Sequence, residues 1–209
     1  MTFVLATNNQ GKAREIKPLF DAAGLKLISL ADLGLSFEAR EDGKTFADNA
    51  TQKATETATF LVNKSMSEYA VLADDSGLVI DALDGQPGVD SALFMGRDTP
   101  YEVKNQSLLD MLVNTPCHMR TARFICTLAC VFPGGSSGSM LMAEGVIEGS
   151  IAHNASGIGG FGYDPIFHYP PFGKTLAELT CEEKSQVSHR GQAIQKMIGL
   201  IIDADFNNK

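Results

Sequence analysis

Residues 3–29 read FVLATNNQGKAREIKPLFDAAGLKLIS, and this stretch decides the fold class. Residues 3–7 are a short apolar run that predicts a buried strand, and a polar turn follows it. From about Lys12, apolar side chains recur at helical spacing as far as Gly24, a residue type that is common at helix ends. Residues 25–29 predict a second strand, so we expect an α/β protein.

Longer segments continue this alternation of strands and helices. From about Phe46, small apolar residues spaced by three and four predict a long helix. Residues 121–131 are apolar on both faces and predict a central strand. Residues 140–151 predict a second long strand, joined to the first by a flexible hairpin connection at residues 134–139. A last helix carries Met197 and several isoleucines at helical spacing.

Capping patterns mark two further helix starts. Thr99 precedes Pro-Tyr-Glu, which predicts a capping box and a helix that ends near Val113. Thr180 and Glu183 repeat the capping-box pattern. Residues 156–164 lie between these two helices and are too glycine-rich for regular structure.

The composition excludes several functional classes. The chain has 209 residues, enough for one domain that spans residues 1–209 and buries a sizeable core. Its net charge of -8 argues against a nucleic-acid or membrane partner, although a few lysines can hold a small anion. The amino end lacks the basic start and long apolar run of a signal peptide, so we expect none there, and no apolar run approaches a membrane span. The cysteines lack metal-site spacing, so we expect reduced, buried thiols in a cytoplasmic protein; they are Cys117, Cys126, Cys130 and Cys181.

Adjacent carboxylates interrupt an apolar run at residues 70–80, AVLADDSGLVI. Asp74 and Asp75 repel each other, and their desolvation is costly, so they form either a solvated acidic turn or the surroundings of a cation. Glu41 adds a carboxylate in the loop before the helix at Phe46. Because magnesium takes oxygen ligands and typically one or two carboxylates with substrate phosphates, and because both flanks are apolar, we favour a metal site.

Two segments in the first quarter of the chain carry lysines. Residues 7–12, TNNQGK, end a strand and begin a helix, so they form either an anion site with Lys12 or an ordinary turn with an asparagine N-cap. The P-loop pattern is absent. Asn49 and Lys53 are four residues apart and share a helix face that is not obviously the alanine face, and a helix lysine is usually solvated.

Two later segments carry aromatic rings and hydrogen-bond donors. Residues 156–167, SGIGGFGYDPIF, form either a surface loop or a close approach to a flat ligand, on which Phe161 and Tyr163 could stack. Residues 182–191, EEKSQVSHRG, place donors at a helix start, and Arg190 can present a donor fork to carbonyl oxygens or phosphate.

Taken together, five segments resemble one family. They are LATNNQGKAREI, TFADNATQKA, ADDSGLVIDALDGQPGV, GIGGFGYDPIF and SHRGQA, and they occur in the family's order as far as residue 193. The chain resembles the bacterial inosine/xanthosine triphosphate pyrophosphatases, which remove non-standard purine nucleotides. The resemblance implies an elongated fold of two lobes around a long central mixed sheet with flanking helices, with the active site in the cleft between the lobes. It also implies a homodimer and magnesium-dependent hydrolysis of ITP, dITP or XTP to the monophosphate and pyrophosphate.

The resemblance assigns roles residue by residue. Asp75 and Lys53 are the expected catalytic residues, and Glu41 and Asp75 the expected Mg²⁺ ligands. The expected substrate-binding residues, with His189 and Arg190 near the base, are Thr7, Asn8, Asn9, Gln10, Gly11, Lys12, Ser76, Phe161, Gly162, Tyr163, Asp164, Lys184, His189 and Arg190. Asp74 and Glu15 match family positions without a defined role.

One departure from the family pattern follows the PGV segment. Bacterial members usually have tyrosine and arginine where this chain has Asp90 and Leu93.

Two alternatives to the function that the resemblance implies stay open. The first is a pyrophosphatase for modified pyrimidine or methylated nucleotides, and the second is a non-catalytic nucleotide sensor, which could dispense with the carboxylates and with Lys53.

Overall fold

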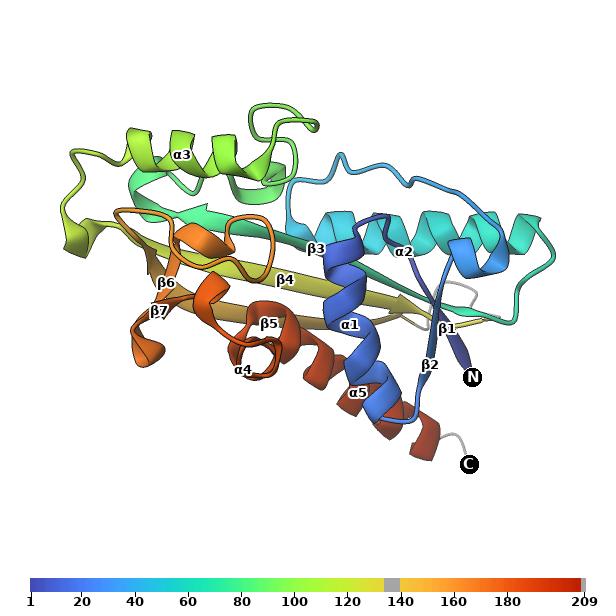
Figure 1. Ribbon diagram of the computed structural model, residues 1–209. Coiled ribbons are helices and arrows are strands. Elements are labelled where there is room, and N and C mark those ends of the chain that lie inside the picture. Colours follow the sequence, from blue (N-terminus) through green and yellow to red (C-terminus); the bar gives the residue numbers. More distant parts are fainter. Residues whose placement is uncertain (134–139, 208–209) are drawn as a thin grey trace. The chain divides into compact units, whose positions relative to one another are not determined.

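The structure is a computed structural model that describes residues 1–133 and 140–207 (Figure 1). The predicted α/β class is confirmed, with a seven-stranded mixed sheet in the order β2-β1-β3-β4-β5-β6-β7. β1 pairs in parallel with β2 and β3, whereas β6 pairs antiparallel with β5 and β7. Among the described residues, no helix is long and apolar enough to cross a membrane.

The elements follow the predicted order closely. The strands are β1 (Thr2–Leu5), β2 (Lys26–Ser29), β3 (Ala70–Ile80), β4 (Thr121–Val131), β5 (Met140–Ile151), β6 (Phe167–Tyr169) and β7 (Lys174–Thr175). The α-helices are α1 (Gln10–Ala22), α2 (Phe46–Asn63), α3 (Tyr101–Met111), α4 (Cys181–Val187) and α5 (His189–Asn207). The long helix at Phe46, both long strands and the last helix are confirmed. The predicted hairpin connection at residues 134–139 lies outside the described residues.

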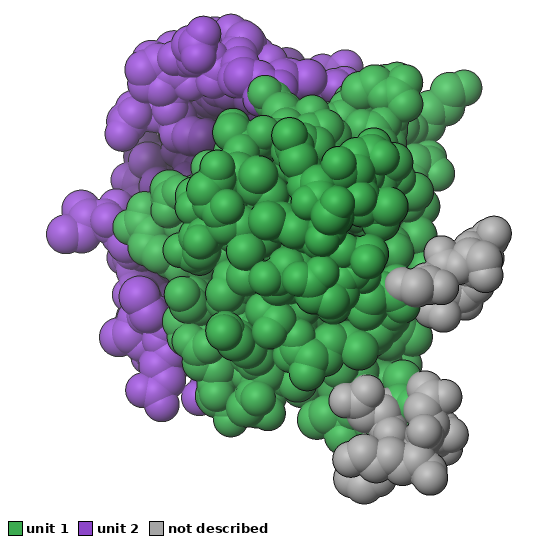
Figure 2. All heavy atoms as spheres, turned by 90° about the vertical axis from the view of Figure 1, so that its right-hand side faces the viewer, with its two compact units in different colours: residues 1–75, 126–145, 190–209 green, residues 76–125, 146–189 purple. Residues whose placement is uncertain are grey.

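The chain divides into two compact units, coloured separately in Figure 2. Unit 1 comprises Met1–Asp75, Cys126–Gly145 and Arg190–Lys209, and unit 2 comprises Ser76–Ile125 and Val146–His189. β3, β4 and β5 each contribute residues to both units.

Unit 1 has helices on both faces of its strands (Figure 1). Because successive strand side chains alternate between faces, two separate cores form. The core on the side of α1 and α5 includes Phe3, Leu5, Ile16, Phe20, Leu72, Leu128, Ile194 and Met197. The core on the side of α2 includes Val4, Ala50, Ala54, Leu61, Val71, Ala73 and Ala129.

Unit 2 has its own apolar core. It includes Leu78, Ile80, Leu108, Leu112, Phe124, Ile147, Tyr163, Ile166, Phe167 and Leu176. Each fully buried large apolar side chain stabilises the fold by about 1.5–3 kcal/mol relative to an exposed one. This core packs α3 together with the segment that carries the glycine-rich residues 156–164, so a mostly irregular loop is anchored by its buried side chains.

Three local predictions are corrected. β3 is one continuous strand through Asp75, so the carboxylates do not interrupt it. Thr99 does not cap α3, because its hydroxyl donates to the Met95 carbonyl at 2.7 Å and the N-cap residue is Pro100. All cysteines are free as expected, but Cys117 and Cys181 are exposed because each begins a short surface helix.

Candidate active site

The alternation of β3 separates the two adjacent carboxylates. Asp74 follows Leu72 on the face that α1 and α5 cover, and Asp75 follows Ala73 on the face that α2 covers. Their side chains are nearly fully buried, with exposed fractions of 1% and 5% for the residues. The interpretation as a solvated acidic turn is therefore wrong, and each carboxylate meets cations from a different part of unit 1.

Asp74 lies between two cations of unit 1. The Lys12 Nζ is 2.5 Å from Oδ1, and the Arg190 Nε is 3.1 Å from Oδ2. Burial acts to raise the pKa of Asp74, but the cations of Lys12 and Arg190 outweigh it and hold that pKa well below its usual range. Cys126 also approaches, with its Sγ 3.4 Å from Oδ2. Burial, followed by the Asp74 charge, raises the pKa of this thiol well above its usual range.

Asp75 meets the helix α2. The Lys53 Nζ donates to Oδ1 at 2.8 Å, and the Asn49 Nδ2 donates to Oδ2 at 3.2 Å. Burial raises the pKa of the Asp75 carboxyl above its usual range, although Lys53 and Lys12 act in the opposite sense. A carboxylate with a raised pKa that still accepts two hydrogen bonds is suited to take up a proton.

The Lys53 ammonium contacts further oxygens besides that of Asp75. Its Nζ also donates to the Asp74 carbonyl at 3.1 Å and lies 3.3 Å from the Glu41 Oε1. Burial acts to lower the pKa of Lys53, and the carboxylates of Asp75 and Asp74 outweigh it and raise that pKa. Lys53 does not have the solvated position that is usual for a helix lysine, because Lys53 and Asn49 are buried together with Ala50.

Two local hydrogen-bond patterns fix the helix that carries Lys53. Thr45 and Asp48 form a capping box at the start of α2. The Asn49 Oδ1 accepts from the Gly43 amide at 2.8 Å, which holds the loop with Glu41 against the first turn of the helix. Asn49 therefore contacts both the loop and Asp75. Helical spacing pairs Asn49 with Lys53 but assigns Asn49 no role.

The polar turn at residues 7–12 forms the start of α1. Asn9 is the N-cap residue, and its Oδ1 accepts from the amides of Gly11 and Lys12 at 2.9 and 3.2 Å. The Thr7 Oγ1 accepts from the Asn9 amide at 3.1 Å. The asparagine cap is thus present, and the positive group that the turn adds to unit 1 is the Lys12 ammonium. Asn8 and Gln10 are exposed beside it.

Arg190 is buried in unit 1, with 2% of the residue exposed. Besides Asp74, its Nη1 contacts the Glu15 Oε2 of α1 at 2.5 Å. Burial acts to lower the pKa of Arg190, but Asp74 and Glu15 outweigh it and raise that pKa. Arg190 therefore joins α5 to β3 and α1, and this pairing supplies the role that Glu15 lacked. A contact with the base stays a prediction.

Unit 2 builds the glycine-rich loop around one carboxylate. The Asp164 Oδ2 accepts from the Phe161 amide at 2.7 Å and from the Lys184 Nζ at 2.5 Å. That ammonium also lies 5.0 Å from the centre of the Phe161 ring. Gly160 has a φ of +67°, and a Cβ there would lie 2.1 Å from the same carboxylate oxygen, so only glycine fits this position.

The other predicted site residues of unit 2 differ in burial. Tyr163 is 3% exposed and packs edge-on against Tyr101, so the prediction that its ring is free to stack on a ligand is corrected. Its hydroxyl belongs to the core, where it donates to the Ser91 carbonyl at 2.7 Å. His189 is buried and stacks on Phe124, with ring centroids 4.7 Å apart. Ser76 is half-buried on β3.

The departing residues Asp90 and Leu93 are both exposed, and they flank the buried Ser91. The Ser91 hydroxyl accepts from the Leu78 amide at 2.9 Å and donates to the Gly88 carbonyl at 2.6 Å. The two substitutions therefore alter the surface of unit 2 and leave the charged groups of unit 1 unchanged.

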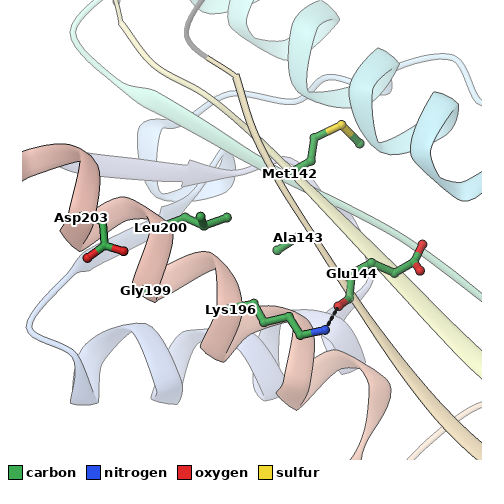
Figure 3. Close-up of a pocket in the computed structure, with 7 residues that line it drawn as sticks. All are labelled: Met142, Ala143, Glu144, Lys196, Gly199, Leu200 and Asp203. Atoms are coloured by element: carbon green, nitrogen blue, oxygen red, sulfur yellow. Dashed lines mark hydrogen bonds between the residues drawn. The ribbon is translucent and has the colours of Figure 1, made fainter.

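An open pocket of about 470 Å³ lies elsewhere in unit 1 (Figure 3). It is lined by residues of β5 and α5, and Lys196 crosses it to donate to the Glu144 carbonyl at 2.7 Å. Among the described residues that line it, the carboxylates are Glu144 and Asp203, and none is a predicted site residue. The candidate site is therefore the charged cluster around β3, and not this pocket.

The fold and the charged groups define an α/β protein whose site combines carboxylates and lysines on two faces of one strand. A profile of the Ham1 family matches residues 3–200, and the chain belongs to this family. A dITP/XTP pyrophosphatase of Clostridium perfringens is 42% identical over 93% of this chain and 94% of that protein. Another, from an Exiguobacterium species, is 45% identical over 97% of each chain.

Solved structures agree with the sequence relatives. The Ham1 protein of Staphylococcus aureus superposes with a TM-score of 0.83 at 36% identity, over 98% of this chain and 100% of that one. A nucleoside-triphosphatase, or dITP/XTP pyrophosphatase, of Mycobacterium abscessus has a TM-score of 0.70 at 38% identity, over 94% and 98%. Both identities are high enough for the likeness to extend beyond the fold to the family.

Proposed function

We propose that this protein hydrolyses non-standard purine nucleoside triphosphates, ITP, dITP and XTP, to the monophosphate and pyrophosphate. Curated relatives that match 93–97% of the chain carry the name dITP/XTP pyrophosphatase, which supports the substrate class. The observation that carries the proposal is the pairing of Asp75 with Lys53 at 2.8 Å on the α2 side of β3, within reach of Glu41.

Asp75 is the proposed general base. The oxygen of a water molecule attacks the α-phosphorus, the bond from that phosphorus to the bridging oxygen breaks, and pyrophosphate leaves. The water gives a proton to an Asp75 carboxylate oxygen as it attacks. Burial raises the pKa of this carboxyl, which strengthens it as a base. Its place on a long strand, held by Lys53 and Asn49, keeps its direction fixed during the reaction.

Glu41 and Asp75 are the residues that would hold Mg²⁺. Both carboxylates lie within 3.3 Å of the same Lys53 ammonium, so their oxygens face one point that already accommodates positive charge. Two carboxylates fit the usual protein share of a magnesium site, in which substrate phosphates and water complete the coordination. When bound, Mg²⁺ neutralises charge that develops on the departing pyrophosphate.

Lysines are the proposed phosphate ligands in unit 1. Lys12 stands at the start of α1, and Lys53 faces the carboxylates from α2. Phosphoryl transfer depends mainly on positioning and on stabilising negative charge, which two ammonium groups can supply. Each ammonium group is paired with a carboxylate, which holds it in position before substrate binds. The phosphates of an incoming triphosphate would compete with these carboxylates for the two ammonium groups.

The loop Phe161–Asp164, with Lys184 and His189, is the proposed base-binding part of unit 2. Lys184 and Asp164 fix the direction of the Phe161 ring, which is half-buried and keeps part of its surface available for stacking. A 6-oxo purine offers an acceptor to nearby donors, whereas adenine offers an amino group there and leaves buried donors unpaired at about 1–3 kcal/mol each. This difference favours inosine and xanthosine nucleotides.

A homodimer in the cytoplasm is the proposed state of the protein. Support for the dimer comes from the family resemblance and from exposed apolar side chains of unit 2, among them Val113 at 71% and Met119 at 53%. A two-fold interface must be self-complementary, which an apolar surface can satisfy. Sedimentation equilibrium tests the dimer, and a monomer at micromolar concentration would refute it.

The decisive experiment measures pyrophosphate release from ITP, XTP, ATP and a methylated pyrimidine nucleotide, with and without Mg²⁺. We expect ITP and XTP to exceed ATP by roughly a hundredfold in kcat/KM, and chelation of Mg²⁺ to stop the reaction. Equal rates for ITP and ATP would refute the substrate class. No release from any nucleotide would favour a non-catalytic sensor. Glu41→Gln should abolish turnover, whereas the adjacent Asp42→Asn serves as its matched control.

A further inference from the structure

The helix α3 contacts the proposed base-binding loop directly. The sequence of this segment predicted a helix but no contact with the loop. Tyr101, Lys104, Asn105 and Leu108 are spaced by three and four and are turned toward the interior of unit 2. Tyr101 packs edge-on against Tyr163, with ring centroids 5.2 Å apart. The Asn105 Nδ2 donates to the Gly162 carbonyl at 3.1 Å. One face of α3 therefore supports two consecutive residues of the loop.

Gly162 is the glycine of the Phe161–Asp164 loop. Its φ is +68°, a region that glycine enters without strain, and it has no side chain that could anchor it. Its neighbours are held by their own groups, because the Tyr163 hydroxyl binds the Ser91 carbonyl and Asp164 binds Lys184. The carbonyl that Asn105 binds thus sets the direction of the peptide between Gly162 and Tyr163.

The asparagine at this position uses its donor group and leaves its acceptor group without a partner among the described residues. The Asn105 residue is 5% exposed, and its Oδ1 is buried without a hydrogen-bond partner among the described residues. A buried acceptor that lacks a partner costs stability, and an apolar residue of similar volume would avoid that cost but would leave the Gly162 carbonyl without its donor. The amide is justified by what its Nδ2 does, which is to hold the loop carbonyl.

We propose that Asn105 is a positioning residue for base selection, which acts through the Gly162 carbonyl to hold the Phe161–Asp164 loop in its ligand-ready conformation. The inference rests on the proposed function, since it assumes that this loop receives the base. Asn105 itself need not touch the nucleotide. A small displacement of the loop misplaces the Phe161 ring and weakens base binding, while the chemistry of unit 1 continues.

Two variants and a control test this inference. Asn105→Leu keeps the side-chain volume and removes the donor, and Asn105→Asp keeps the shape and sets an acceptor against the Gly162 carbonyl. Gln106→Leu changes the next residue of α3, which is exposed and whose Nε2 donates to the Asp110 Oδ1 at 2.7 Å, away from the loop. Each protein is assayed for kcat and KM with ITP and ATP, and for binding of inosine monophosphate by calorimetry.

We expect both Asn105 variants to raise KM for ITP about tenfold with kcat within about twofold, and to narrow the ratio of ITP to ATP. Inosine monophosphate should bind correspondingly more weakly, and Gln106→Leu should match the wild type. If one Asn105 variant does not fold, the other decides. A wild type that prefers ITP, with an unchanged ratio and unchanged monophosphate affinity in a folded variant, overturns this inference alone. A wild type that does not distinguish the bases overturns the proposed function and this inference with it.

Discussion

Arg190→Met is the substitution that most sharply tests how the charged cluster is built. It removes the guanidinium that bridges Asp74 and Glu15 while keeping an unbranched side chain of similar reach. Removing one partner of a buried ion pair costs about 3–5 kcal/mol, because the remaining charge stays desolvated. Asp74 keeps Lys12 at 2.5 Å, and Glu15 is partly exposed, so we expect the lower end, about 3 kcal/mol.

Urea unfolding measures this loss. With a slope of about 2–3 kcal/mol per molar, a loss of about 3 kcal/mol lowers the unfolding midpoint by about 1–1.5 M. Arg14→Met is the matched control, because Arg14 is an exposed arginine of α1 and should shift the free energy of unfolding by no more than about 0.5 kcal/mol. If both variants shift the midpoint equally, the bridge does not stabilise the fold and the reasoning is refuted.

Activity measurements on Arg190→Met also distinguish two alternative roles of Arg190. If the guanidinium acts by holding Asp74 and Glu15, kcat/KM for ITP and for ATP should fall by similar factors. If it binds the base, as the family resemblance implies, the loss should fall mainly on ITP and the ratio of the two substrates should narrow. Burial of Arg190 against two carboxylates leads us to expect the first result.

Three further predictions concern the two faces of β3. Asp75→Asn should fold normally and lose at least about a hundredfold in kcat, as expected for a general base; retention of more than a tenth of wild-type turnover contradicts the role. Lys12→Ala and Lys53→Ala should weaken all nucleoside triphosphates by similar factors, measured as kcat/KM for ITP, XTP and ATP, and a loss confined to one base would exclude phosphate binding. Asp74 has a lowered pKa in the folded protein, so its contribution to stability is complete above its ordinary value of 3.8 and is lost as the pH falls below it. The free energy of unfolding should therefore drop less between pH 7 and pH 3 in Asp74→Asn than in the wild type.

Much of the fold could be predicted because its signals are local. The run at residues 3–29 contains a strand, a capped helix and a second strand within one window, and α2 and α5 show helical spacing over many residues. The predicted start of α3 was wrong because two local interactions compete for the Thr99 hydroxyl. Its hydroxyl can cap a helix or close a turn onto Met95, and only the folded backbone decides which.

The cluster could be predicted only in part, since its partners are distant in the sequence. Asp74 and Arg190 are 116 residues apart, and no spacing rule connects them. The run Asp-Asp-Ser-Gly is also typical of a turn, and pairing with neighbouring strands overrides that preference. Similarly, the role of Asn105 depends on a loop 57 residues away.

The alternation of β3 explains how two adjacent carboxylates can both be buried, and it gives them different surroundings. The strand directs Asp74 toward Lys12 and Arg190, whose charges keep its pKa low and keep it ionised. It directs Asp75 toward α2, where burial raises the pKa although Lys53 is close. Two neighbouring groups of the same kind thus have pKa values displaced in opposite directions, a division that separates an anchoring anion from a proton acceptor. Asp74 therefore organises the cations of unit 1, and Asp75 is the carboxylate that we propose as the acceptor of the proton from water.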